Sequence, residues 1–558
     1  MTEHRKAIEV MRLARMGAYH QNRLSFMRIL LRYLKLENWV FSRPHWEVND
    51  QGVGYAVYEA KGPRRTYSLV AFSHDLPEEQ RSDRVIAQAW DATFALFDGV
   101  PSKEDILRLI GNVPYQEAGR ILKTELSLSR ANRSSRLWSH VVDALAQGQQ
   151  PDEKEVEKIG YLMRTTAVYG SGKFGAGDRG LMEDRTALSI PFLVEMLNVY
   201  LTREFTLDLV EHVAKAKGGE KAVVIERNLR RKFGIGNSTG LGLAPFLVNH
   251  PALLHAWVFA KEEAYRRVRD IAAASEREKQ QFIHYLKRAQ IDVAQWHSEH
   301  EVQQGRIKEL ATDLQKLEEH LQTEGFSSSQ PWEQLYQWTK EDLSLEGQEL
   351  FLTLMLEPYG EVVDELAKIL SADEESVFAI DGSMEVAAAI ELLKKHYGWA
   401  LEIDFNDPSQ RQHIWYTSVE KQEPRLGDRT EDGVLADYEQ PLCIAYDVSR
   451  LYQQLGQCQP NEKLADILGQ YPEFRHVVRR MQIVAHKPYA EICDNLTSKD
   501  IFPIDFLRFK LAYFGATKFD PRSNLWVRIC MYQNAPFADE LGYFPCDDWV
   551  YPPLKGEV

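Results

Sequence analysis

The spacing of apolar and polar positions near the start of the chain predicts one helix and then three strands. Residues 4–36 place apolar side chains at helical intervals, with lysines and arginines between them. The stretches 39–42, 54–60 and 66–72 are rich in β-branched and aromatic residues and are separated by turn sequences. We therefore expect a helix with one solvated basic face, followed by an antiparallel meander.

Helical periodicity dominates the pattern from there to the middle of the chain. Residues 84–146 have a helical pattern that ends in the polar segment 147–157, which has the composition of a linker. Two further stretches, 191–201 and 205–216, also have helical patterns.

A seam of apolar positions, alternating at three and four residues, runs from Phe282 to Leu321. No proline occurs between Pro251 and Pro331, so nothing in the sequence forces a break. We predict one long, coiled-coil-like helix that ends in a hinge at 324–331. The seam must be covered by another helix of the same chain or by a second protomer, and we favour a homodimer.

The first and last thirds of the chain share an ordered series of landmarks. Each series has a short segment that runs from leucine to tryptophan, strands, an Ala-aromatic-Asp triplet, and an aromatic-Gly pair followed by Lys-Phe. The first series comprises residues 34–39, 89–91, 167–170 and 173–174, and the second comprises 393–399, strands at 399–405 and 413–420, 445–447, 512–515 and 518–519. Shared order and spacing predict an internal duplication.

These patterns predict an α+β fold that is mostly helical. Two pseudo-repeated α+β parts, residues 1–190 and 331–558, flank a helical region, 191–330, that contains a glycine-rich loop and the long helix.

Composition and charge narrow the classes of function. The 558 residues include 82 acidic and 67 basic ones, a net charge of -15, which argues against nonspecific binding to nucleic acid or acidic lipid. No apolar run reaches the length of a membrane helix and no signal peptide begins the chain, so we expect a cytoplasmic protein without a membrane partner. The five cysteines include no CxxC pair, which argues against a disulfide framework or a cysteine zinc site.

Two glycine-rich runs, 170–178 and 232–243, carry the candidate chemistry. The first matches G-x-G-x-x-G but lacks the acidic residue at the end of a second strand that a dinucleotide site requires, and its lysine is not followed by Ser or Thr as in a P-loop. No cofactor is therefore assigned, and no histidine pair has the third ligand that a metal site needs.

Lysine precedes phenylalanine three times beside glycine, at Lys173, Lys232 and Lys518. If each phenylalanine anchors its segment in the core, the lysines can be directed at one point. Glycine-rich backbone and a helix N-terminus after the second run add N–H donors for an anion. The residues that we expect to bind a carboxylate or phosphate are Arg164, Lys173, Lys232, Asn237, Ser238, Thr239 and Lys518.

Two hypotheses follow. The first is an enzyme that acts on a small anionic metabolite, with Tyr169, Asp178 and His250 as candidates for proton transfer. The second is a non-catalytic oligomeric scaffold that recruits a partner through the long helix. The sequence identifies neither the substrate nor the reaction.

Overall fold

The structure is a computed structural model that describes most of residues 2–556. The residues outside the description are 78–88, 112–121, 123, 171–187, 189, 191, 238–249, 372–377, 408–414, 418–423, 427–429, 432–433, 436–443, 495–502, 516–517, 522–526 and 546. The described part is a mixed α+β protein, as the sequence predicts.

The chain forms two compact units, and each unit is built from three separate segments. Unit 1 comprises residues 1–18, 240–276 and 324–509, and unit 2 comprises residues 19–239, 277–323 and 510–558. The domain boundaries at 190 and 330 stay a prediction.

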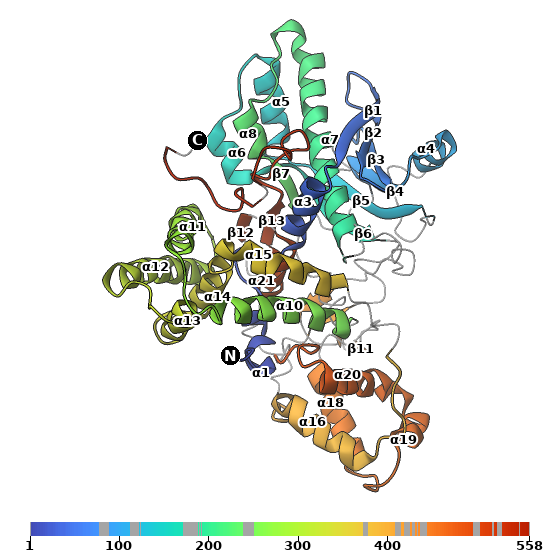
Figure 1. Cartoon of the computed structure of the whole chain (residues 1–558). Coiled ribbons are helices and arrows are strands. Elements are labelled where there is room, and N and C mark those ends of the chain that lie inside the picture. The colour runs from blue at the N-terminus through green and yellow to red at the C-terminus, as the bar shows by residue number, and fades with distance from the viewer. Residues whose placement is uncertain are drawn as a thin grey trace. The chain divides into compact units, whose positions relative to one another are not determined.

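Unit 2 is organised around a nine-stranded sheet (Figure 1). The strands, in spatial order, are β1 (Val40–Val48), β2 (Gly54–Lys61), β3 (Thr66–Ser73), β4 (Ala92–Asp98), β5 (Glu125–Arg133), β6 (Tyr161–Gly170), β7 (Gly234–Asn237), β13 (Val527–Met531) and β12 (Lys518–Pro521). Only the pair β6 and β7 is parallel, and every other neighbouring pair is antiparallel.

The predicted meander is confirmed in β1, β2 and β3. The turn between β1 and β2 closes because Asn49 accepts hydrogen bonds from Gln51 and Val53 through its side chain, and Gly52 adopts a φ of +79° that favours glycine. β1 forms one edge of the sheet, where Pro44 lies within an irregularity of the strand pairing, a common way of protecting an exposed edge.

One long helix covers much of this sheet. α7 (Leu193–Gly218) packs against the strands from β2 to β7, and the helical pattern expected on both sides of residue 203 belongs to this single element. Most of its residues are buried, and its buried polar group Asn198 hydrogen-bonds the hydroxyls of Ser127 and Ser129 on β5 at 3.0 and 2.8 Å. The other helices of this part of unit 2 are α3 (Phe26–Leu36), α4 (Lys103–Ile110), α5 (Trp138–Ala146), α6 (Glu153–Ile159) and α8 (Arg227–Arg231).

The single long helix predicted from the apolar seam is wrong. The seam is divided between α11 (Glu276–Ala294) and α12 (Glu301–Thr323). α11 ends in a tight turn in which the amides of Gln295 and Trp296 bond carbonyls three residues back. The two helices contact each other where Gln290 Nε2 donates to Glu318 at 2.9 Å. Two short helices joined by a turn can cover each other's apolar residues, so the pattern does not require one rod.

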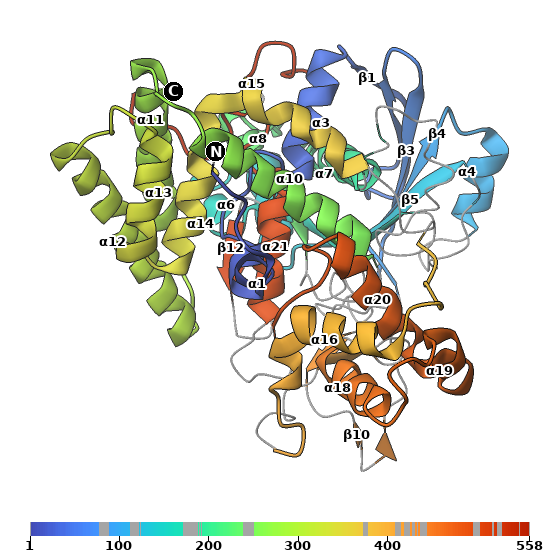
Figure 2. The same ribbon diagram turned by 60° about the horizontal axis from the view of Figure 1, so that its bottom comes forward.

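Unit 1 is almost entirely helical. Its principal helices are α1 (Ala7–Val10), α2 (Leu13–Met16), α10 (Pro251–Arg269), α13 (Pro331–Asp342), α14 (Leu345–Leu354), α15 (Gly360–Val363), α16 (Val386–Leu401), α18 (Ile444–Leu455), α19 (Leu464–Gln470) and α20 (Arg475–His486). Figure 2 shows α16, α18 and α20 gathered together, and each of the three packs against the other two. Two small hairpins join β8 (Trp415–Thr417) to β9 (Pro424–Leu426) and β10 (Thr430–Glu431) to β11 (Val434–Leu435).

Several expected elements differ from the structure. The strand expected at 399–405 is wrong because α16 continues to Leu401, and Asp91 precedes strand β4 instead of lying in a helix. Corresponding landmarks of the proposed duplication also occupy different elements: Asp447 lies in α18, whereas its counterpart Asp91 lies beside a strand. The apolar patterns are similar, but the secondary structures that they adopt are not.

Candidate functional site

A lysine side chain is buried inside unit 2. Lys510 lies on α21 (Pro503–Phe514), is 5% exposed, and donates a hydrogen bond from Nζ to Oδ1 of Asn237 at 2.6 Å. The ring of Phe514, one helical turn further on, has its centroid 5.8 Å from the same Nζ. Among the described residues, Nζ therefore has a polar neighbour in Asn237 and an aromatic neighbour in Phe514.

The amide that receives this hydrogen bond stands at the carboxyl end of a strand. Asn237 is the last residue of β7 and pairs with Thr165 of β6. Its Nδ2 donates to Thr165 Oγ1 at 2.9 Å, and the Thr165 hydroxyl donates to the carbonyl of Gly236 at 3.3 Å. Both side chains are buried. These connected hydrogen bonds fix the orientation of the Asn237 side-chain amide.

Two glycines permit this arrangement. A Cβ on Gly236 would lie 2.7 Å from the ring of Tyr161, so only glycine lets β7 approach β6 this closely. Gly515 ends α21 with a φ of +98°, a left-handed conformation typical of a residue that terminates a helix. The glycine beside the third Lys-Phe pair thus has a structural role in placing the helix that carries Lys510.

The surroundings of Lys510 disfavour its charged form. Burial lowers the pKa of the Lys510 amine to about 7, because the ammonium loses its hydration. No carboxylate among the described residues forms an ion pair with it. An ammonium has three N–H donors to satisfy, whereas a neutral amine has two and a lone pair. Among the described side chains Lys510 has one hydrogen-bond acceptor, Asn237 Oδ1, which is fewer than an ammonium can use.

The described cations predicted from the sequence do not meet at this point. Arg164 is buried on β6, but it immediately precedes Thr165 and so extends from the opposite face of the strand. Lys232 forms ion pairs with Glu153 and Glu157 of α6, at 2.5 Å to Glu157, while Phe233 is buried beside it. Asn237 is the one predicted residue that contacts Lys510 through a described side chain.

The remaining predicted residues are placed only in part. Lys518 begins strand β12 and Tyr169 lies in β6, but their side chains are outside the described residues. His250 belongs to unit 1, where it directly precedes α10. Lys173, Asp178, Ser238 and Thr239 lie outside the described residues, so their roles stay predictions.

Sequence reasoning missed Lys510, although a signal is present. The helix reads Leu507 to Phe514 as LRFKLAYF, in which one lysine is enclosed by apolar residues. A lysine inside an apolar helical stretch is either extended to solvent or buried, and only the tertiary structure distinguishes the two.

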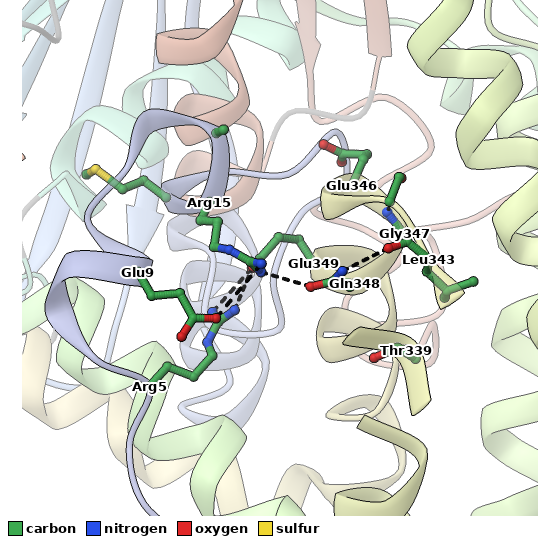
Figure 3. Close-up of polar contacts among 12 residues, drawn as sticks. Arg5, Glu9, Arg15, Thr339, Leu343, Glu346, Gly347, Gln348 and Glu349 are labelled. Atoms are coloured by element: carbon green, nitrogen blue, oxygen red, sulfur yellow. Dashed lines mark hydrogen bonds and ion pairs between the residues drawn. The ribbon is translucent and has the colours of Figure 1, made fainter. Parts of the chain in front are cut away.

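Unit 1 contains a second group of buried charges, drawn in Figure 3. Arg5 binds two carboxylates, with its Nη2 2.7 Å from Glu262 on α10 and its Nη1 2.6 Å from Glu349 on α14. Arg15 approaches Glu349 at 3.4 Å and donates to Gln348 at 3.1 Å. Burial acts to raise the pKa of Glu349, but the charges of Arg5 and Lys261 outweigh it and lower the pKa.

These charges have partners within their own unit. The segment that carries Arg5 and Arg15 is thereby held to α10 and α14, and Tyr489 adds a hydrogen bond to the Arg5 carbonyl at 2.7 Å. A group of buried ions that satisfy one another stabilises a particular packing and leaves little free capacity for a ligand. We interpret it as structural.

Two other classes of site have no support in the described part of the chain. No group of three or more potential ligand side chains is placed to hold a metal ion there. Among the helices of the described residues, none combines the length and the hydropathy needed to cross a membrane.

Comparisons with known proteins give no further assignment. No protein-family model matches the chain, and neither does any curated protein or solved structure.

Proposed function

We propose that this protein is an enzyme that acts on a small anionic metabolite, and that Lys510 contacts the substrate. The observation that carries the proposal is a buried lysine whose acceptor among the described side chains is the neutral amide of Asn237. Asn237 ends one of two parallel strands, and in proteins with open parallel sheets ligands bind beyond the carboxyl ends of such strands.

Electrostatics supports an anionic ligand. A positive charge that is removed from water costs several kcal/mol unless a negative group accompanies it. A carboxylate or phosphate beside Lys510 would supply that charge and the hydrogen-bond acceptors that the ammonium lacks. Binding of the anion should therefore be accompanied by uptake of a proton near neutral pH.

Other parts of the expected site belong to the same proposal. Lys173, Ser238, Thr239 and Lys518 are proposed to contribute to anion binding, and Tyr169, Asp178 and His250 to proton transfer. A cytoplasmic location, a homodimer and an origin by internal duplication also stay proposals.

The alternative of a non-catalytic scaffold has less support. It requires the apolar seam at 282–321 to be open to a partner. Leu286 and Ala289 on α11, and Leu310 and Leu314 on α12, are at most 1% exposed in a single chain. A partner helix would have to displace the residues of the same chain that already cover these four side chains.

Ligand-induced stabilisation tests the proposal. Short carboxylates and phosphates should raise the melting temperature of the wild-type protein. At a ligand concentration of 100 times Kd, the free energy of unfolding should increase by about 2.7 kcal/mol. Lys510→Met, which keeps a long unbranched side chain but not its charge, should reduce the affinity at least about tenfold. Lys232→Met, at a surface ion pair, is the matched control and should bind like the wild type. An unchanged anion response in Lys510→Met would refute the proposal.

A further inference from the structure

We propose that Lys510 acts as a nucleophile and forms an imine with a carbonyl group of the substrate, which would then be a small anionic aldehyde or oxo acid. This inference rests on the proposed function and adds the substrate class and the bond that is made.

The directions of the hydrogen bonds determine how the Asn237 amide faces Lys510. The Thr165 hydroxyl uses its hydrogen on the Gly236 carbonyl, so its oxygen accepts from Asn237 Nδ2. Asn237 is thereby oriented with Oδ1 toward Lys510. An amine that donates one N–H to this oxygen keeps its lone pair directed away from Asn237, as attack on a carbonyl carbon requires.

The surroundings of Lys510 favour the neutral amine, which is the form that acts as a nucleophile. Asn237 and Thr165 are neutral, and the centroid of the Phe514 ring lies 5.8 Å from Nζ. No described carboxylate pairs with Lys510 to hold the proton on it. Burial lowers the pKa of the amine to about 7, so a large fraction is the free base at neutral pH. Lysines that act as nucleophiles are activated in this way, by desolvation in an apolar pocket.

The reaction balances without an added oxidant or reductant. The Lys510 nitrogen attacks the carbonyl carbon and forms a C–N bond, while the carbonyl oxygen takes the proton that the nitrogen releases. The resulting carbinolamine takes up a second proton from solvent and loses its hydroxyl as water when the nitrogen lone pair forms the C=N bond. The product is a protonated imine, whose positive charge is matched by the anionic group of the same substrate. Such an imine withdraws electrons from the adjacent carbon and makes C–H or C–C cleavage there easier.

The burial of Lys510 also limits the substrate. Its side chain, like those of Asn237 and Thr165, is less than 6% exposed. A reactive amine in this position favours a compact molecule over a polymer or a protein side chain.

Reductive trapping tests the imine. The full-length protein is incubated with sodium cyanoborohydride and with glyoxylate, pyruvate or 2-oxoglutarate. Each is matched by the hydroxy acid of the same length, which has the carboxylate but no carbonyl. We expect one of the oxo acids to increase the protein mass by the mass of the probe less one oxygen atom. Peptide mapping should place the adduct on Lys510.

Two variants give the inference a sharper readout. Lys510→Arg keeps a cation but not the nucleophile, so it should abolish the adduct. Asn237→Asp places a carboxylate beside the amine, which should retain its proton, and the pH at which trapping is half-maximal should rise by at least about one unit. Lys217, exposed and paired with Asp143, reports background alkylation in the same digest.

The outcomes separate the inference from the proposed function. Trapping at Lys510 supports both. Lys510-dependent stabilisation by oxo and hydroxy acids alike, without an adduct, overturns the imine and leaves the anion site. No adduct and no Lys510-dependent stabilisation overturns both.

Discussion

Lys510 and Asn237 are 273 residues apart in the chain, yet their side chains meet at 2.6 Å inside unit 2. This contact joins α21 to the parallel pair β6 and β7 of the nine-stranded sheet. It brings a chemically active group into a place that neither sequence segment indicates by itself. The stability of the protein should therefore depend on the protonation of this one amine.

Replacing Lys510 by methionine should stabilise the folded protein at neutral pH. The pKa of the lysine is about 7 when folded and near its ordinary value of 10.5 when unfolded, so the unfolded chain binds more protons between these values. In the wild type the penalty of the buried charge is fully present below pH 7 and disappears as the pH rises toward 10.5. Lys510→Met removes it, which corresponds to a gain of about 2–4 kcal/mol at pH 7.

Urea denaturation from pH 6 to pH 10 measures this gain. The difference between Lys510→Met and wild type should shrink steadily above pH 7. Lys217→Met, at an exposed site, should show no such pH dependence. A difference that stays constant with pH would show that Lys510 does not titrate in this range.

A half-buried carboxylate on α7, Glu204, which lies 3.6 Å from Arg230, should give the opposite pH dependence. Burial raises the pKa of Glu204 to about 7, although its carboxylate accepts a hydrogen bond from Ala538 N at 3.0 Å. The folded protein therefore holds a proton that the unfolded chain has released between pH 4.5 and 7, and the stability contributed by this group falls across that window. Glu204→Gln retains the acceptor for Ala538 and should stabilise the protein by about 1–2 kcal/mol at pH 8.

The same comparison at pH 4.5 is the control for Glu204→Gln. There the wild-type side chain is protonated in the folded state, so the variant and the wild type should be nearly equal in stability. Equal stability at both pH values would mean that Glu204 remains ionised throughout.

Removing Arg5 should destabilise unit 1 strongly. Arg5→Met leaves Glu262 and Glu349 buried without their principal counter-ion. Loss of one partner from a buried ion pair costs about 3–5 kcal/mol. Arg266→Met, which removes partly exposed pairs within α10, should cost less than about 1 kcal/mol. Denaturation curves of the two variants provide the test. Similar losses in the free energy of unfolding would show that the buried ion pairs of Arg5 contribute no more than the partly exposed pairs of Arg266.

A pair of glycine substitutions tests the close approach of β7 to β6. Gly236→Ala places a methyl group 2.7 Å from the Tyr161 ring and should destabilise the protein by about 1–3 kcal/mol while reducing ligand binding at Lys510. Gly305 lies on α12, and a Cβ added to it would have no neighbouring atom within 4 Å. Gly305→Ala should therefore stabilise the helix by about 0.5–1 kcal/mol. Calorimetric melting temperatures should move in opposite directions.

Local patterns predicted several elements well. Strands β1 to β3 follow the β-branched and aromatic stretches, because alternating side chains and turn residues act over a few positions. The helical character of α7 was also readable from its apolar spacing. The seam of α11 and α12 was recognised, but the break between Ala294 and Glu301 was not, since no proline or glycine marks it.

By itself, the sequence determined which segments are amphipathic and where β-rich stretches begin, because these properties depend on neighbours within a few residues. It also directed attention to Asn237, through the glycines around it. Only the tertiary structure decided that Lys510 is the amine beside it and that Lys232 is paired at the surface. The environment of a charge depends on groups hundreds of residues away, and sequence spacing carries no measure of that desolvation.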